Sequence, residues 1–257
     1  MKVLLLAGGF GTRLSEETEI KPKPMVEIGG MPIIWHIMKL YSHYGFNEFV
    51  VLLGYKAYYI KEYFANYFLH RSDMTIDLQN NAMSIHHTNV EPWKITLIDT
   101  GLKSMTGARI KKAREYVGNE TFMLTYGDGV SDVDIAKLLK YHKAGGKLAT
   151  VTSVRPTGKF GVLDINNLNM VNAFREKAGS DEAWINAGFF ALEPEIFDYI
   201  DDNDNTAWEK APLENIANDK QLIAYKHTGF WRPMDTLRDK FELENLWESG
   251  KAPWKVW

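Results

Sequence analysis

The segment KVLLLAGGFGTRL, residues 2–14, joins a short apolar run directly to a glycine-rich turn that ends in Thr-Arg. The apolar run predicts a central strand with both faces buried. Glycines just past the carboxyl end of a strand let the backbone turn sharply and expose amide N–H groups to an anion. Because ligands of open α/β sheets bind at that edge, the segment predicts an α/β fold with a phosphate cradle after its first strand.

Arg13 strengthens this interpretation, because its permanent charge and planar donor fork suit phosphate oxygens. Two commoner phosphate loops are excluded by their patterns. No Gly-Lys pair is followed by Ser or Thr, as a nucleotide P-loop requires, and Leu14 stands where the dinucleotide fingerprint has its third glycine. A tight turn without a ligand is the alternative that glycines alone would favour. Thr12, Arg13 and the motifs further along the chain favour phosphate binding.

Strand and helix patterns alternate along the first half of the chain, and the second half is richer in strands. The predicted strands are residues 2–7, 49–53, 74–78, 83–87, 95–99, 122–126, 149–154, 161–165, 170–176 and 184–192. The predicted helices are residues 32–45, 57–70, 106–117, 133–142, 194–200, 212–219 and 236–250. We therefore predict a single α/β domain over residues 1–257, with a Rossmann-like, mostly parallel mixed central sheet flanked by helices.

Composition excludes several classes of protein. The chain of 257 residues has a net charge of −3 and no long basic run, so nothing suggests a nucleic-acid-binding surface. It has no cysteine, which excludes disulfides and thiolate metal sites and fits a reducing compartment. It shows no signal peptide and no apolar run of about 18 residues. We expect a cytoplasmic protein with no membrane partner.

Lys23 stands between two prolines in the sequence IKPKPM, residues 20–25. The prolines favour extended backbone, so this lysine can reach an anion held by the nearby glycine turn. A solvated basic turn is the alternative for the segment taken alone. Together, however, LAGGFGTRL at 6–14 and PKPM at 22–25 form a pattern that resembles the sugar-1-phosphate nucleotidyltransferases.

The resemblance extends along nearly the whole chain. Motifs similar to those of the family stand at residues 125–129, 160–163, 176–177, 186–188 and 231–236. Residues 90–93, 99–101, 104–109 and 234–240 are similar to the glucose-1-phosphate cytidylyltransferases within that family. One departure is Ala178, which follows Lys177 where the family usually has proline.

The resemblance implies a role for each matched position. Arg13 and Lys23 are implied catalytic residues, and Asp128 and Asp235 are implied ligands of a Mg²⁺ cofactor. The implied nucleotide-binding residues are Leu6, Ala7, Gly8, Gly9, Gly11, Thr12, Arg13, Lys23, Ser104, Thr106, Gly107, Arg109 and Gly127. The implied sugar-phosphate-binding residues are Gly161, Glu176, Lys177 and Asn186.

The resemblance also implies the reaction and the partners. The expected reaction transfers a cytidylyl group from CTP to α-D-glucose 1-phosphate, giving CDP-glucose and pyrophosphate. We expect the sugar-binding part mainly in residues 150–235, a C-terminal helical tail at 236–257, and a homo-oligomer. Another nucleoside triphosphate or another phosphorylated substrate is an alternative, as are a nucleotide-sugar-dependent glycosyltransferase and a non-catalytic regulatory subunit.

Two acidic features leave a choice of interpretation. Asp132 and Asp134 imitate the Asp-x-Asp metal motif of glycosyltransferases, but they precede a predicted helix, where aspartates are good caps. Asp128 and Asp235 are far apart in sequence, so only the fold can bring them together. Without an ion their like charges are expected to repel each other, and asparagine at either position is expected to stabilise the empty protein.

Overall fold

The first strand, β1 (Lys2–Ala7), lies inside a seven-stranded sheet with the order β14-β10-β13-β8-β1-β4-β7. The computed structural model describes residues 1–155, 161–165, 171–176 and 184–257. The other strands of this sheet are β4 (Glu48–Leu53), β7 (Lys94–Asp99), β8 (Phe122–Tyr126), β10 (Ala149–Val154), β13 (Ile185–Leu192) and β14 (Leu222–Lys226). All pairings among them are parallel except those of β13. The predicted mixed, mostly parallel α/β sheet is confirmed.

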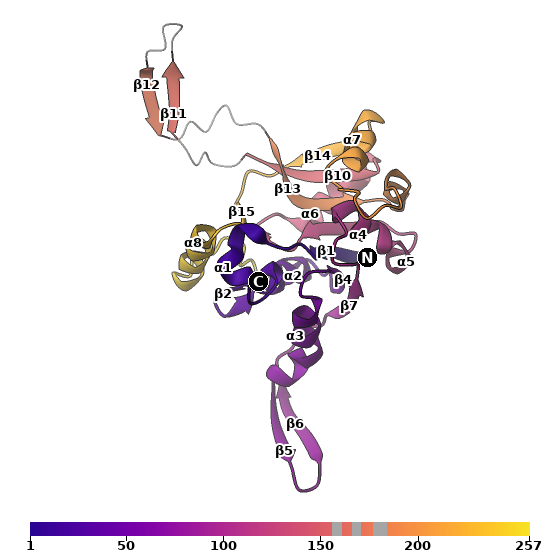
Figure 1. Cartoon of the computed structure of the whole chain (residues 1–257), viewed down its shortest axis with the longest axis vertical. Coiled ribbons are helices and arrows are strands. Elements are labelled where there is room, and N and C mark those ends of the chain that lie inside the picture. Colours follow the sequence, from indigo (N-terminus) through magenta and orange to yellow (C-terminus); the bar gives the residue numbers. More distant parts are fainter. Residues whose placement is uncertain (156–160, 166–170, 177–183) are drawn as a thin grey trace.

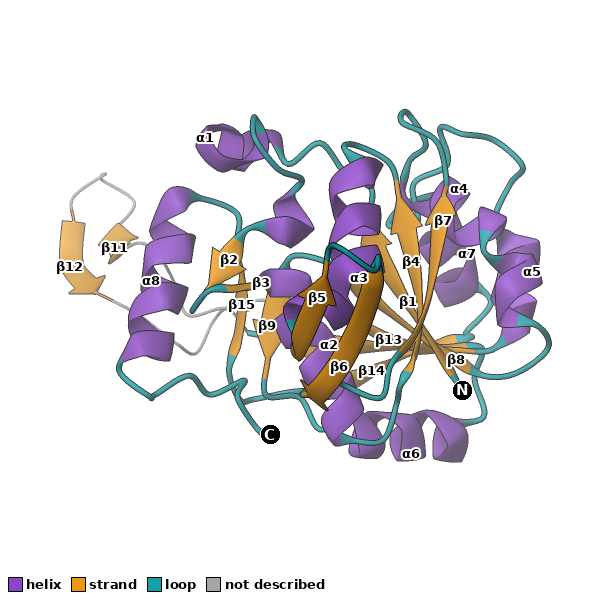
Figure 2. Ribbon diagram, turned by 90° about the horizontal axis from the view of Figure 1, so that it is seen from below, coloured by secondary structure: helices purple, strands orange, loops and turns teal. Residues whose placement is uncertain are grey.

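Alternating side chains of β1 point into two separate hydrophobic cores. Val3 and Leu5 pack with residues of α2 (Ile33–His43), α3 (Ala57–His70) and α6 (Ile135–Gly145). Leu4 and Leu6 pack on the opposite face. That face is covered by α4 (Thr106–Lys112), α5 (Arg114–Val117), η3 (Pro194–Tyr199) and α7 (Ala211–Asn218). Figure 2 shows these two helical layers on either side of the sheet. An entirely apolar strand suits this position, because neither of its faces meets water.

Seven short elements and the longer helix α8 lie outside the seven-stranded sheet. They are η1 (Thr12–Leu14), α1 (Ser15–Thr18), η2 (Lys23–Met25), β2 (Glu27–Ile28), β3 (Met31–Pro32), β9 (Gly129–Ser131), β15 (Trp231–Pro233) and α8 (Leu237–Glu248). β9 pairs with β15 in an antiparallel ribbon, which joins two segments about a hundred residues apart in sequence. Two hairpins, β5 (Ser72–Asp77) with β6 (Ala82–Thr88) and β11 (Gly161–Ile165) with β12 (Val171–Glu176), extend away from the sheet (Figure 1).

The structure corrects some predicted boundaries. The helix predicted at 106–117 is two helices that meet at Ala113. The helix predicted to begin at 133 begins at Ile135, because the Asp134 side chain accepts a hydrogen bond from Lys137 N at 2.8 Å and caps it. The capping interpretation of Asp134 is therefore confirmed. β14 and the β9–β15 ribbon were not predicted from the sequence, because their strands lack a clear alternation.

The C-terminal segment docks against α2 through aromatic side chains. α8 begins with a capping box between Thr236 and Asp239. After it, the buried Trp254 donates from Nε1 to Nδ1 of the buried His36 at 3.3 Å, and His36 Nε2 lies 2.8 Å from the carbonyl oxygen of Ile28. His36 is therefore held as the neutral imidazole with its proton on Nε2.

Within the described residues, no helix combines the length and apolar character needed to span a bilayer.

Burial of His36 predicts a loss of stability in mild acid. Burial lowers the pKa of His36 from 6.5 to about 4, so the unfolded chain binds a proton in this range before the folded protein does. The stabilisation is fully present above pH 6.5 and is lost as pH falls towards 4, by up to roughly 3 kcal/mol. Urea unfolding measured from pH 7 to 4.5 should show a steeper loss for the native chain than for His36→Gln. An equally steep loss in His36→Gln would contradict the assignment, and His86→Gln, on the exposed hairpin, is the control.

Candidate active site

The glycine turn opens at the carboxyl end of β1, beside the ends of β4 and β8. In register, Ala7 pairs with Leu53, and Leu6 pairs with Tyr126. The turn lines a cavity of about 540 Å³ whose walls include all of residues 6–13 together with residues 102–106 and 126–128. Gly11 adopts φ of 67°, a left-handed conformation that favours glycine. The predicted cradle therefore borders a cavity large enough for a nucleotide.

Arg109 supports the glycine turn through hydrogen bonds to backbone oxygens, and its side chain is not free to extend into the cavity. Its buried guanidinium donates to the carbonyl oxygens of Gly8 at 3.0 Å, Leu53 at 2.9 Å and Gly101 at 2.8 Å. It also donates to Thr100 Oγ1 at 2.6 Å. A Cβ on Gly8 would lie 2.3 Å from Arg109 Nη1, so glycine is required there by this close approach. Arg109 lines the cavity, but its donors hold the ends of β1 and β4 together.

Of the other predicted nucleotide-binding residues, Ser104 and Thr106 line the same cavity and Gly107 does not. Ser104 Oγ donates to the carbonyl oxygen of Thr100 at 2.6 Å, and Thr106 Oγ1 donates to Glu209 Oε2 at 2.6 Å. Gly107 lies behind the wall: a Cβ there would come within 2.8 Å of the Thr206 carbonyl oxygen. The structure therefore places Ser104 and Thr106 at the cavity and gives Gly107 a packing role.

Four charged residues from distant segments meet beside the turn. Lys23 Nζ lies 2.7 Å from Asp128 Oδ2 and 2.7 Å from Asp235 Oδ1. Arg13 Nη1 lies 2.9 Å from the other oxygen of Asp235. The β9–β15 ribbon brings the aspartates together, and Met234 N donates to the Asp128 carbonyl oxygen at 2.8 Å. The expected meeting of Arg13, Lys23, Asp128 and Asp235 is observed.

Lys23 holds a charged ammonium between the two carboxylates. Its side chain is only 9% exposed, and burial lowers the pKa of Lys23, but Asp128 and Asp235 outweigh burial and raise that pKa above its ordinary value. The repulsion expected between two unpaired carboxylates is therefore absent, because a cation already lies between them. Asparagine at Asp128 or Asp235 is therefore not expected to stabilise the protein, because that expectation depended on the repulsion.

The two carboxylates also suit a divalent ion. Among the described residues, no group of three or more His, Cys, Asp or Glu side chains could hold a metal by itself. Mg²⁺ usually takes only one or two protein carboxylates and completes its shell with substrate phosphate and water. Asp128 and Asp235, already converging on one cation beside the cradle, fit that donor set.

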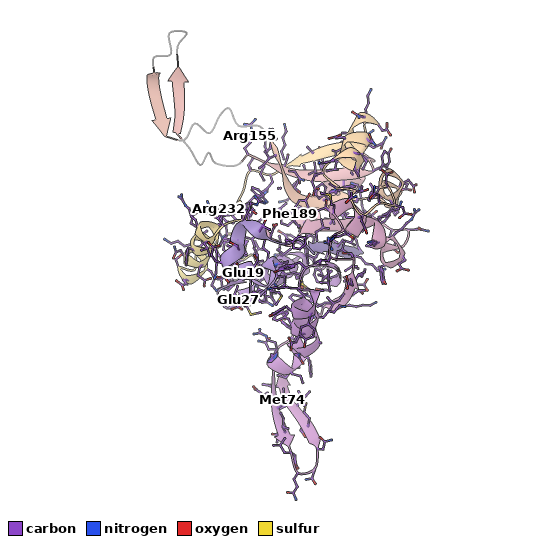
Figure 3. The ribbon with its side chains drawn as sticks, in the orientation of Figure 1. Glu19, Glu27, Met74, Arg155, Phe189 and Arg232 are labelled. Atoms are coloured by element: carbon purple, nitrogen blue, oxygen red, sulfur yellow. The ribbon has the colours of Figure 1, made fainter. Side chains whose placement is uncertain are left out.

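A second cavity of about 430 Å³ adjoins the first and shares part of its wall. It is lined by Asn186 and Phe189 of β13 and by Trp231 of β15; Figure 3 labels Phe189. Trp231 Nε1 donates to the Ala187 carbonyl oxygen at 2.7 Å. Five residues line both cavities: Arg13, Thr106, Tyr126, Asp128 and Glu209. Two ligands in these cavities would meet beside Arg13 and Asp128.

The predicted sugar-phosphate-binding residues are divided between two regions. Asn186 lines the second cavity, and its Nδ2 lies 3.4 Å from the hydroxyl of Tyr126. Gly161 and Glu176 are register partners in the β11–β12 hairpin. Lys177 lies outside the described residues.

Glu209 and Tyr126 line the candidate site but were not predicted from the sequence. The Tyr126 hydroxyl donates to Glu209 Oε1 at 2.5 Å, and both side chains line both cavities. Glu209 has no recognisable motif around it. Tyr126 lies inside the family-like motif at residues 125–129, at the end of a predicted buried strand, and that motif was interpreted only through Gly127 and Asp128.

The ion cluster predicts that Asp235→Asn destabilises the empty protein. The substitution leaves Lys23 with one carboxylate and Arg13 with none, and hydrogen bonds to charged groups typically contribute about 1.5–3 kcal/mol. Urea unfolding with a metal chelator and without nucleotide measures the loss. Asp134→Asn is the matched control, because asparagine caps a helix as well as aspartate. A more stable Asp235→Asn variant would mean that carboxylate repulsion dominates after all.

The chain is similar to known proteins both in sequence and in fold. The sequence model described as nucleotidyl transferase matches residues 2–248. The glucose-1-phosphate cytidylyltransferases of Salmonella typhimurium and Salmonella typhi are each 58% identical over 258 residues, which cover 100% of both chains. The crystal structure of an apo UDP-glucose pyrophosphorylase superposes with a TM-score of 0.70 at 19% identity, covering 97% of this chain and 98% of that one.

Proposed function

Because this chain belongs to the nucleotidyl transferase family, we propose that it joins a nucleotide to a sugar phosphate, as a glucose-1-phosphate cytidylyltransferase. It transfers the cytidylyl group of CTP to α-D-glucose 1-phosphate and releases pyrophosphate. The observation that best supports this assignment in the structure is the meeting of two cavities beside Arg13, Lys23 and Asp128. Two polyanionic substrates would approach each other there.

In the proposed mechanism the first cavity binds CTP. Backbone N–H groups of the glycine turn hold the triphosphate, and Arg13 neutralises charge that develops on the leaving pyrophosphate. Arg109 holds the turn in place through the Gly8 carbonyl oxygen. Such positioning and charge stabilisation supply most of the catalysis in phosphoryl transfer.

Lys23, which lines the first cavity, is proposed to bridge the phosphates of the two substrates near the reacting phosphorus. Asp128 and Asp235 would hold Mg²⁺, which when bound neutralises phosphate charge and orients phosphate oxygens. The attacking oxygen belongs to a phosphate, whose second pKa of about 6 leaves it largely ionised near neutral pH. No general base is therefore required.

The second cavity is proposed to bind glucose 1-phosphate. Asn186 lines it and offers hydrogen bonds to sugar hydroxyls, while Arg13 lies at its border with the first cavity. Glu176 and Lys177 keep their proposed sugar-phosphate roles by family resemblance. The sugar-binding part is accordingly assigned mainly to residues 150–235.

The nucleotide preference tests this function. With glucose 1-phosphate, pyrophosphate release should be fastest with CTP and slower with UTP, dTTP, GTP and ATP. The assay should use equal, subsaturating nucleotide concentrations so that rates compare kcat/KM. Equal rates with CTP and dTTP would remove the cytidylyltransferase assignment while leaving a nucleotidyltransferase. Absence of pyrophosphate release with every pair of substrates would refute the whole proposal.

Arg13→Ala is expected to lower kcat without disrupting the fold. The side chain is 72% exposed and buries little, but the variant loses a charged stabiliser of the leaving group. Losses of this kind typically cost on the order of 10²- to 10³-fold in turnover. Arg238→Ala, an 88% exposed arginine paired with Glu242 on α8, is the control. Near-normal turnover in a folded Arg13→Ala variant would exclude the proposed role.

We also propose that the chain forms a homo-oligomer through the β5–β6 hairpin. One face of this hairpin is apolar, because Met74 pairs with Ile85, and Ile76 pairs with Met83. Ile76, Met83 and Ile85 are 56%, 50% and 43% exposed. Figure 1 shows the hairpin projecting away from the sheet, and Figure 3 labels Met74 on it. A two-stranded ribbon is marginal alone, so a second copy of the chain is proposed to cover this face.

A charge on the apolar face should reduce the oligomer. Ile76→Asp and Met83→Asp each place a carboxylate in the proposed contact, so sedimentation velocity should detect a smaller species than for the native chain. Ser84→Asp is the matched control, because Ser84 pairs with Thr75 on the opposite face. A native chain that sediments as a monomer at micromolar concentration, or an unchanged mass in both apolar-face variants, would rule out this interface.

A further inference from the structure

Glu209 lies in the wall between the two cavities and is exposed to both. The residue before it, Trp208, is fully buried in the core beneath α4. The backbone that carries Glu209 is therefore anchored, while its carboxylate faces the space proposed for the substrates.

Two directional chains of hydrogen bonds end on this carboxylate. In the first, Trp208 N donates to Thr106 Oγ1 at 2.9 Å, and Thr106 Oγ1 donates to Glu209 Oε2 at 2.6 Å. In the second, Asn186 Nδ2 lies 3.4 Å from the Tyr126 hydroxyl, which donates to Glu209 Oε1 at 2.5 Å. Each carboxylate oxygen thus has one donor, and the side chain is held from both sides.

Each of these oxygens keeps further capacity to accept hydrogen bonds. An ionised carboxylate has about four lone-pair positions, and the two chains use one on each oxygen. Neither chain supplies a cation. Within the described part of the chain, Glu209 forms no ion pair, whereas Asp128 and Asp235 share Lys23.

A carboxylate without a cation is unfavourable beside two phosphate groups, because like charges repel each other. Asp128 and Asp235 have an explanation in metal binding, but Glu209 points across the wall formed with Tyr126 and Thr106. An acceptor-only group at this place suits a neutral part of a ligand that donates hydrogen bonds. Both proposed substrates carry such a part, since each contains a polyhydroxylated sugar ring.

We propose that Glu209 is a specificity-determining residue that accepts hydrogen bonds from the hydroxyl groups of a substrate sugar ring. The ring is either the ribose of the nucleotide or the hexose of the sugar phosphate, because Glu209 borders both cavities. Tyr126 and Thr106 are positioning residues that orient its carboxylate. The proposal rests on the proposed function, which supplies two substrates with such rings.

The test compares Glu209→Gln with the native enzyme on substrates that lack single hydroxyl groups. One series uses CTP, 2′-deoxy-CTP and 3′-deoxy-CTP with glucose 1-phosphate. The other uses CTP with glucose 1-phosphate and its 2-, 3-, 4- and 6-deoxy analogues. For the complete substrates, Glu209→Gln should lower kcat/KM about 10- to 100-fold, as expected for a hydrogen bond to a charged group.

The decisive result is the substrate analogue on which the native enzyme and Glu209→Gln have the same kcat/KM. When the contacted hydroxyl is missing, the native enzyme has already lost the interaction, so Glu209→Gln should cost little more. Equality in the nucleotide series would identify the ribose, and equality in the hexose series would identify the acceptor sugar. Tyr126→Phe should show the same pattern to a smaller degree, since it removes one orienting donor and keeps the carboxylate.

Two outcomes would overturn the proposal: an unchanged kcat/KM in folded Glu209→Gln, or the same fold-loss on every substrate in both series. Glu214→Gln, an exposed position on α7 outside both cavities, is the matched control, and thermal unfolding checks the fold of every variant. If the native enzyme prefers another nucleoside triphosphate, the cytidylyltransferase assignment fails. The hydroxyl series, repeated with that nucleotide, still tests Glu209.

Discussion

The parallel pairing of β1 with β4 and β8 is the constraint on which the rest of the structure depends. It places the carboxyl ends of three strands side by side, so the segments that follow them must meet at one edge of the sheet. The glycine turn follows β1, and Gly127 and Asp128 follow β8. Arg109 holds this edge together, because its guanidinium joins the Gly8 and Leu53 carbonyl oxygens.

Arg109, Lys23 and Arg13 at this edge have different roles, because their surroundings differ. Arg109 is buried and donates hydrogen bonds to backbone carbonyl oxygens and to the Thr100 hydroxyl. Its rigid, planar set of donors suits several acceptors at fixed positions. Lys23 is nearly buried but pairs with two carboxylates. Arg13 is largely exposed and stands at the border of both cavities. The charges of Asp128 and Asp235 are therefore balanced by Lys23 and Arg13 through direct ion pairs.

That balance bears on how the proposed reaction begins. The carboxylate oxygens that fit a divalent ion are in contact with the Lys23 ammonium, and the Lys23 ammonium that fits a phosphate is in contact with these carboxylates. A substrate phosphate would replace the carboxylates as the partner of Lys23, and a metal ion would replace Lys23 as the partner of the carboxylates. The same pairing explains why aspartates that are separated by about a hundred residues can lie together without a metal.

The sequence by itself determined the class of fold and the edge where the site lies, because the apolar strand 2–7, the glycine turn and the strand–helix alternation are local patterns. It also located Arg13, Lys23, Asp128 and Asp235 through motifs. Only the tertiary structure decided that Lys23 pairs with both aspartates, that Arg109 supports the turn, and that Tyr126 and Glu209 form the wall between two cavities. These contacts join residues 83 to 212 positions apart, and no local pattern records such distances.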